Sequence, residues 1–238
     1  MILIVPALSD DSYKPYLHKA NVPEHPKIKL YGSYQTNLFP GAATYSYPLE
    51  VPPGTNGLQP FISITYNSQN VKQRPGILGA GWFLTQNHVY RDVNFTPDNA
   101  SDDEFKLILN GNFYDLVYNT SDSLYHTKIE SFLRIQNLTG ASNAYGGYWL
   151  VTAKDGTQFR FGNNSDSELT SNAGKNYALR WSLDQIKDTH ENKIFYSYLE
   201  DPNAVDKGTA YLSQILYNLD QKRKIEFKYE SSARPDAR

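Results

Sequence analysis

Apolar and polar residues alternate in short runs along most of the chain, and most runs end at glycine, proline, asparagine or aspartate. A period of two places successive side chains on opposite faces of an extended strand, so these runs predict half-buried β-strands. Residues 44–49 (TYSYPL) and 61–66 (FISITY) are clear examples. Because no long stretch has the i, i+3, i+4, i+7 spacing of an amphipathic helix, the pattern predicts an all-β fold with little or no helix.

Several of the predicted strands are expected to pair as hairpins. Asn110-Gly111 and Asp155-Gly156 are strong signals, because both residues of each pair tolerate the positive φ that a type I′ turn requires. Two later hairpins resemble each other, since LDQIKD at 183–188 matches LSQILY at 212–217. A single hairpin is marginally stable in water, so we expect antiparallel hairpins to stack into a large curved sheet or shell segment. The predicted hairpins span residues 105–117, 149–161, 179–198 and 212–229.

The start of the chain has a different character. Residues 1–30 are rich in proline and lysine and have no clear period, which predicts an extended leader. The β-rich domain is expected over residues 31–238. The short apolar start, residues 1–8, is interrupted by proline and lacks a basic segment, so it predicts neither a signal peptide nor a membrane span. The sequence stops soon after a predicted strand, and we expect the natural protein to continue or another chain to cover that open edge.

Composition excludes several classes of function. The 23 Lys and Arg against 25 Asp and Glu give a net charge of −2, which argues against a nucleic-acid or anionic-membrane surface. With no cysteine there is no disulfide framework, thiolate metal site or thiol chemistry. The 19 tyrosines suit sheet faces that are half buried, because tyrosine combines an apolar ring with a polar tip.

No motif predicts a catalytic, cofactor-binding or metal-binding residue. The glycines of residues 76–81 are in the order GxxGxG, which is not a phosphate-binding loop, and they predict a tight turn before a largely buried Trp82. No two histidines have metal-ligand spacing, and no G-x-S-x-G elbow occurs. The acidic segments 102–104 and 188–191 are alternatives for a calcium or other metal site, but a solvated loop and a solvated turn are favoured.

The middle of the chain contains N-x-Ser/Thr triplets, which mark acceptors for N-glycosylation in exported proteins. Chance in a chain rich in Asn, Ser and Thr explains them equally well. The candidate acceptors are Asn94, Asn99, Asn119, Asn137 and Asn163.

Residues 41–92 carry an ordered signature. It runs from a glycine and an alternating strand through Pro-Pro-Gly, Gly-Leu-x-Pro and Tyr-Asn-Ser to Gly-x-Gly-Trp and a basic residue. This order resembles the N-terminal domain of the Salmonella plasmid virulence protein B, a domain that also opens insecticidal toxin-complex B subunits and many RHS/YD-repeat proteins. The likeness extends to about residue 236. The main signature residues are Pro52, Pro53, Gly54, Tyr66, Asn67, Ser68, Gly79, Gly81 and Trp82.

The resemblance implies a structural role. In the toxin complexes this region begins a hollow β-shell that encloses a toxic C-terminal polypeptide, and catalysis in the Salmonella protein belongs to a separate domain. The family's Asp-x-x-Gly-Asn turn differs here, because Glu191 stands where the glycine would be, before Asn192.

We therefore expect a non-enzymatic module, without cofactor or metal, of a secreted or cell-surface protein. Its partners would be the rest of its own larger chain, neighbouring shell subunits and an enclosed toxin polypeptide. The alternatives are a carbohydrate-binding or adhesive surface domain, which needs an exposed aromatic platform with polar neighbours, and a glycoside hydrolase. A hydrolase needs two carboxylates across a cleft, about 5–10 Å apart.

Overall fold

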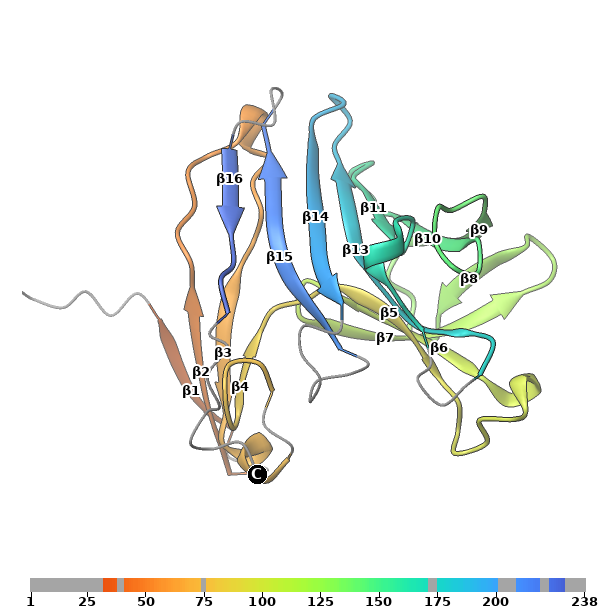
Figure 1. The fold of residues 1–238 in the computed structure, drawn as a ribbon, viewed down its shortest axis with the longest axis horizontal. Helices are drawn as coiled ribbons and strands as arrows, with labels where there is room; N and C mark the ends of the chain where they lie inside the picture. The colour runs from red at the N-terminus through yellow and green to blue at the C-terminus, as the bar shows by residue number, and fades with distance from the viewer. Residues whose placement is uncertain are drawn as a thin grey trace, which may run out of the picture. The chain divides into compact units, whose positions relative to one another are not determined.

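The computed structural model describes residues 32–37, 41–73, 76–170, 175–200, 209–218 and 223–229. These residues belong to one unit, Gly32–Arg238, and form antiparallel strands in two sheets of four and twelve strands (Figure 1). The all-β prediction is therefore confirmed. The leader predicted for residues 1–30 lies outside the described residues.

The four-stranded sheet has the order β1-β2-β3-β4. Its strands β2 and β3 contain most of the two alternating runs that the sequence singled out. Successive side chains along each strand point to opposite faces of the sheet. Tyr66 and Trp82 are cross-strand partners at the far side of this sheet. The strands are β1 (Ser33–Asn37), β2 (Ala42–Pro48), β3 (Ser63–Asn67) and β4 (Trp82–Leu84).

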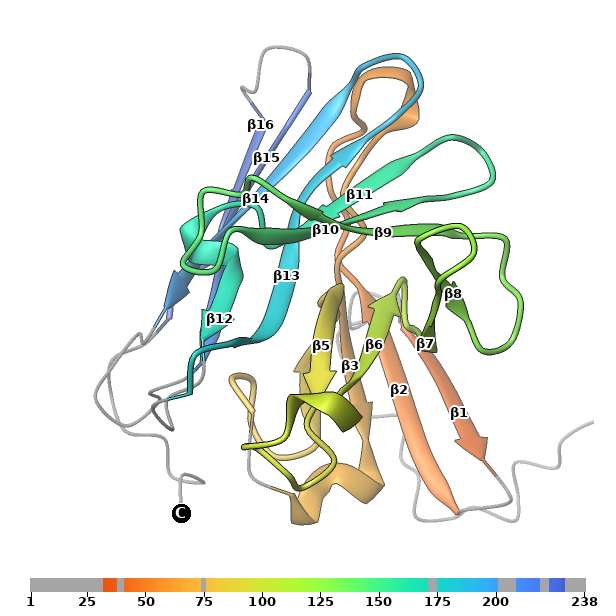
Figure 2. The ribbon, with the colours of Figure 1, turned by 90° about the vertical axis from the view of Figure 1, so that its right-hand side faces the viewer.

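The larger sheet closes on itself. Its strands follow the order β11-β10-β9-β8-β7-β6-β5-β13-β14-β15-β16, and β11 also pairs with β13, so that β5–β11 and β13 form a ring (Figure 2). The long strand β13 permits this closure, because its first half pairs with β5 and its second half with β11. The second half also pairs with β14, from which the sheet continues outside the ring. The ring strands are β5 (His88–Asp92), β6 (Glu104–Leu109), β7 (Asn112–Asn119), β8 (Leu124–Thr127), β9 (Arg134–Thr139), β10 (Gly147–Thr152), β11 (Gln158–Phe161) and β13 (Ala178–Lys187).

The two similar hairpins lie next to each other in this sheet. Strands β13, β14, β15 and β16 run side by side, as the repeat predicted (Figure 1). A short strand, β12, pairs with the other edge of β13. The bounds are β12 (Glu168–Thr170), β14 (Lys193–Glu200), β15 (Ala210–Tyr217) and β16 (Arg223–Glu226).

Helical structure in the described part of the chain consists of 3-10 turns of three to five residues. None of these segments is long and apolar enough to cross a membrane. They are η2 (Thr55–Gly57), η3 (Ser68–Lys72), η4 (Ala100–Asp102) and η5 (Ser165–Ser167).

Aromatic side chains pack together against the core of the ring. Trp149 is fully buried and lies 4.7 Å from the ring of Tyr125, 5.1 Å from Phe105 and 5.9 Å from Trp181, measured between centroids. Tilted and edge-to-face pairs of this kind stabilise a core beyond the burial of their area alone. The aliphatic part of the same core includes Val89, Leu107, Ile135, Val151 and Leu183.

The hairpin turns follow the sequence prediction in part. At Asn110-Gly111 both residues have positive φ, of 51° and 80°, as a type I′ turn requires. At Asp155-Gly156 only the glycine does, so the type I′ prediction is wrong there. Ala153 donates its N–H to the Thr157 carbonyl at 2.8 Å, which closes a three-residue loop with Gly156 in its left-handed position.

Candidate functional site

The Pro-Pro-Gly part of the signature covers the end of β15. The hydroxyl of Tyr217 donates to the carbonyl oxygen of Pro52 at 2.8 Å, and the N–H of Thr55 donates to Asn218 Oδ1 at 3.1 Å. Gly54 is required by close approach, because a Cβ atom there would lie 1.7 Å from the carbonyl oxygen of Leu58. Pro53, which precedes Gly54, is exposed to solvent. These residues therefore join the loop between β2 and β3 of the small sheet to the large sheet.

The glycine cluster forms the tight turn that the sequence predicts. Gly79 and Gly81 have φ of 108° and 77°, and a Cβ atom on Gly81 would lie 2.9 Å from the rings and methyls of Tyr66 and Val71. Trp82 follows this turn and packs 5.1 Å from the Tyr66 ring. Its side chain is half-buried, so the expectation of a largely buried indole is met only in part.

The Tyr-Asn-Ser residues hold the same corner together. Asn67 caps η3 by accepting the Gln69 N–H on its side-chain oxygen at 2.9 Å, and its own N–H donates to the Gly81 carbonyl. Ser68 Oγ accepts the Ala43 N–H at 2.9 Å. In this structure each of these signature residues has a role in the fold.

The acidic turn at residues 188–192 is built around one carboxylate. Asp188 Oδ1 accepts the N–H groups of His190 and Asn192, both at 2.8 Å, and Oδ2 accepts the Asn192 side-chain amide at 2.6 Å. Glu191 pairs with Lys187 at 3.2 Å. Among the described residues, no group of three or more His, Asp or Glu side chains is arranged to hold a metal ion. The carboxylate of Asp188 therefore stabilises the turn through these hydrogen bonds.

Residues 102–104 also have partners within the fold. Asp102 Oδ2 accepts the Thr96 hydroxyl at 2.8 Å, and Asp103 forms an ion pair of 2.6 Å with Arg91. Glu104 lies 3.9 Å from Lys106. The segment closes the loop between β5 and β6.

The glycosylation candidates differ in accessibility. Asn163 is half-buried and donates its N–H to Asp184, while the Asn94 side chain donates to the Asp102 carbonyl at 2.5 Å. Modification of any of them stays a prediction. The exposed acceptors are Asn94, Asn99, Asn119 and Asn137.

A buried polar centre lies where sequence reasoning gave no signal. Asp184, in the middle of β13, is fully buried and accepts Arg160 Nε and the Asn163 N–H, both at 2.6 Å, and the Ser167 hydroxyl at 3.3 Å. Burial raises the pKa of Asp184, and the ion pair with Arg160 opposes that shift. The centre ties β11, η5 and β13 together, and only the ring closure brings these residues into contact.

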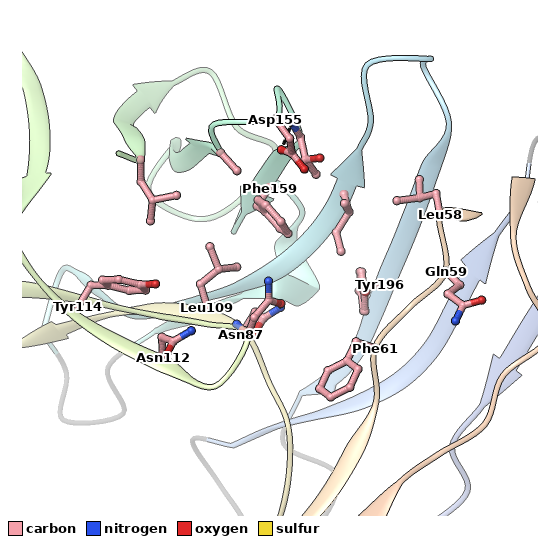
Figure 3. Close-up of a pocket in the computed structure, with 15 residues that line it drawn as sticks. Leu58, Gln59, Phe61, Asn87, Leu109, Asn112, Tyr114, Asp155, Phe159 and Tyr196 are labelled. Atoms are coloured by element: carbon pink, nitrogen blue, oxygen red, sulfur yellow. Dashed lines mark hydrogen bonds between the residues drawn. The ribbon is translucent and has the colours of Figure 1, made fainter. Parts of the chain in front are cut away.

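A pocket of about 400 Å³ opens beside the ring (Figure 3). Its buried side chains are mainly apolar and come from four different strands, namely Leu109, Phe159, Ile186 and Tyr196. Its rim carries exposed amides and one acid, Gln59, Asn110, Asn112 and Asp155. The pocket lies between the loop after η2 and the turns of two ring hairpins.

Three of the polar residues of this pocket, Asn87, Asn110 and Asp155, are held by hydrogen bonds at the turns. Asn87 Oδ1 accepts the Asn110 N–H at 2.8 Å, and Asp155 Oδ1 accepts the Thr157 N–H at 2.9 Å. Asp155 is the one charged residue among the described residues that line the pocket. A glycoside hydrolase needs a second carboxylate across the pocket from Asp155, and the described lining residues supply none.

Comparison with known proteins identifies the fold. The chain is 18% identical to the protein in a crystal structure of TcdB2-TccC3 over 78% of the chain, with a TM-score of 0.59. It is 19% identical to a chain of the Photorhabdus luminescens Tc holotoxin pore over 74% of the chain, with a TM-score of 0.56. For the N-terminal domain of effector protein SpvB from Salmonella typhimurium, the identity is 20% over 71% of the chain, with a TM-score of 0.55. No curated protein sequence matches the chain.

The chain spans 10% and 9% of the two toxin-complex chains and 62% of the SpvB domain chain. At these identities the structural likeness establishes the fold. A sequence profile described as "SpvB: Salmonella virulence plasmid 65kDa B protein" matches residues 37–231, which is more than half of the chain. This match confirms the resemblance carried by residues 41–92, and the chain belongs to the family of the Salmonella virulence plasmid 65kDa B protein.

Proposed function

We propose that the chain is a structural module of the β-shell of a secreted or cell-surface toxin-complex protein of the RHS/YD-repeat type. It would help to build or cap a cage around a C-terminal polypeptide. The observation that carries this proposal is that the same fold occurs as about a tenth of much larger toxin-complex chains. A fold that forms a small part of a much larger chain is suited to a structural role within that chain.

The strand arrangement supports this role. On the described residues β16 pairs with β15 and has no strand on its other side. Phe227 donates its N–H to the Ser213 carbonyl at 2.9 Å, and N–H direction alternates along a strand, so the N–H groups of Lys224 and Glu226 point away from β15. These groups are placed to accept a further strand, from the remainder of its own chain or from a neighbouring shell subunit.

The proposed role includes no catalysis and no cofactor. The buried carboxylate of Asp184 binds Arg160 and a backbone N–H, and that of Asp188 binds backbone N–H groups of its own turn. Carboxylates that are engaged in this way stabilise the fold and are poorly placed to act on a substrate.

Electron cryomicroscopy of the full gene product tests the proposal. We expect a hollow particle in whose wall the two sheets of this chain are recognised, with a C-terminal polypeptide that resists added protease until the particle is opened. A solid particle, or a C-terminal segment digested at the rate of an unprotected chain, would contradict the cage role.

A substitution on the edge strand tests the way in which the shell is extended. Lys224→Pro removes an outward N–H without removing a bond to β15, so the full gene product should no longer assemble a closed particle. Lys224→Ala is the matched control and should assemble normally. Equal assembly of both variants would show that β16 is not the edge at which the shell continues.

A further inference from the structure

We infer that the pocket between the loop after η2 and the ring hairpins binds a neutral carbohydrate of one or two sugar rings. This inference goes beyond the shell role and does not depend on it. It rests on the size of the pocket, its mainly apolar base, the fixed amides Asn87 and Asn110, and the lack of cationic side chains among the described lining residues.

The size and the base of the pocket suit a sugar. A volume of about 400 Å³ lies in the lower part of the range of roughly 300–1,000 Å³ that small-molecule sites occupy. The base is formed by buried side chains that include Phe159 and Tyr196. A pyranose ring has one face of C–H groups that packs on such a surface, while its hydroxyl groups project sideways toward a polar rim.

Two aromatic side chains flank the opening. Phe61 is 64% exposed, although it lies beside an apolar base, and Tyr114 is half-buried at the start of β7. Figure 3 shows these two rings on opposite sides of the pocket, with Asn87 and Asn112 between them. An exposed aromatic ring next to amide groups is the arrangement in which stacking and hydrogen bonding act on the same ligand.

Two amides of the pocket, Asn87 and Asn110, are held in place before any ligand arrives. Asn110 is in the left-handed position of its turn with φ of 51°, and both its N–H and its side-chain oxygen bond to Asn87, at 2.8 Å and 3.4 Å. Asp155 is held by its bond to the Thr157 N–H. Binding groups that are already ordered lose little conformational entropy when a ligand binds.

The charge of the lining selects the ligand class. None of the described residues that line the pocket is Lys, Arg or His, so phosphate, sulfate and carboxylate ligands have no counter-charge there. The side chains of Asn, Gln, Thr and Tyr supply both donors and acceptors, which matches a ring of neutral hydroxyl groups. Asp155 adds one strong acceptor for a pair of hydroxyl groups.

Saturation-transfer NMR on the purified full chain tests the inference. The probes are glucose, galactose, N-acetylglucosamine and lactose, with N-acetylneuraminate as an anionic probe and a primary amine, benzylamine, as a cationic one. We expect saturation transfer to at least one neutral sugar, with a dissociation constant on the order of 1 mM by titration. The anionic sugar should receive none.

Two variants locate the binding to this pocket. Phe61→Ala and Asn112→Ala should each weaken binding about fivefold to tenfold, since one removes a stacking ring and the other a rim amide. Phe113→Ala and Asn119→Ala are matched controls, because both residues lie exposed on β7 outside the pocket. They should bind like the unmodified chain.

The remaining outcomes contradict the inference. Absence of transfer to all of the neutral sugars would overturn it, as would sugar binding that the two pocket variants and the two controls share equally. Transfer to benzylamine alone would show that Asp155 makes the pocket a site for cations.

Discussion

The hydroxyl of Tyr217, at the end of β15, donates a hydrogen bond of 2.8 Å to the carbonyl oxygen of Pro52, a residue 165 positions earlier in the chain. The ring of Tyr217 is buried, with an exposed fraction of 1%. This bond joins the Pro-Pro-Gly loop to the large sheet. The Pro-Pro-Gly segment, which the sequence predicts as a turn, therefore also makes a contact between residues distant in the chain.

Removal of this hydroxyl should destabilise the chain. Tyr217→Phe keeps the buried ring but leaves the Pro52 carbonyl without its donor, so we expect the free energy of unfolding to fall by about 1–2 kcal/mol. Urea denaturation followed by circular dichroism measures the change. Tyr118→Phe, at an exposed position of β7, is the control and should change little. A Tyr217→Phe chain as stable as the unmodified one would show that water replaces the bond.

Glycine at position 191 should stabilise the chain. Glu191 has φ of 66°, in the left-handed region, and occupies the same position in its three-residue loop as Gly156 does in the turn between β10 and β11. Glu191→Gly relieves this strain and should raise the free energy of unfolding by about 0.5–1 kcal/mol, despite the loss of an exposed ion pair with Lys187. Urea denaturation measures it. Glu191→Ala keeps the strain and loses the pair, so an equal gain there would refute the explanation.

Alanine at position 81 should destabilise the chain more than alanine at position 111, another glycine with a left-handed backbone conformation. Gly81→Ala adds strain and also a Cβ atom 2.9 Å from Tyr66 and Val71, which should lower the free energy of unfolding by about 2–3 kcal/mol. Gly111→Ala has the strain alone, since nothing lies within 4 Å of its Cβ position, and should lower it by about 1 kcal/mol. Thermal and urea unfolding of both variants give the difference. Equal losses of unfolding free energy in the two variants would show that Tyr66 and Val71 move away from the new Cβ atom without an energetic penalty.

Stability should fall as the solution becomes acidic because of His88. Burial and the charge of Arg180 lower the pKa of His88 from 6.5 to about 4, against the opposing bond to the Gln86 carbonyl. The unfolded chain therefore takes up a proton at higher pH than the folded chain, and stability is lost as the pH falls from about 6.5 to about 4. The loss from this group is at most about 3 kcal/mol.

His88→Gln should make the pH dependence shallower over that window. Urea midpoints of the variant and the unmodified chain, measured in steps across the window, give the comparison. Parallel curves would show that the imidazole is not buried as a neutral group.

The alternation of apolar and polar residues predicted most of the strands, because side-chain direction in a strand depends only on neighbours along the chain. The runs around Tyr45 and Ile64 became β2 and β3, and Asn110-Gly111 became the expected turn. The glycines before Trp82 also formed their turn. Each of these features is local, and local sequence is sufficient to specify it.

The tertiary structure decided which strands pair and what the loops enclose. A period of two does not distinguish an open sheet from the closed ring that the pairing of β11 with β13 forms. Asp184 and Arg160 meet only because of that closure, and Phe61 reaches the pocket beside Tyr196 only because the loop after η2 folds over the large sheet. The sequence by itself determined most of the strands and some of the turns, since these depend on short-range sterics and burial. The ring, the buried ion pair and the pocket depend on contacts between distant residues, whose choice of partner is set by packing of the whole domain.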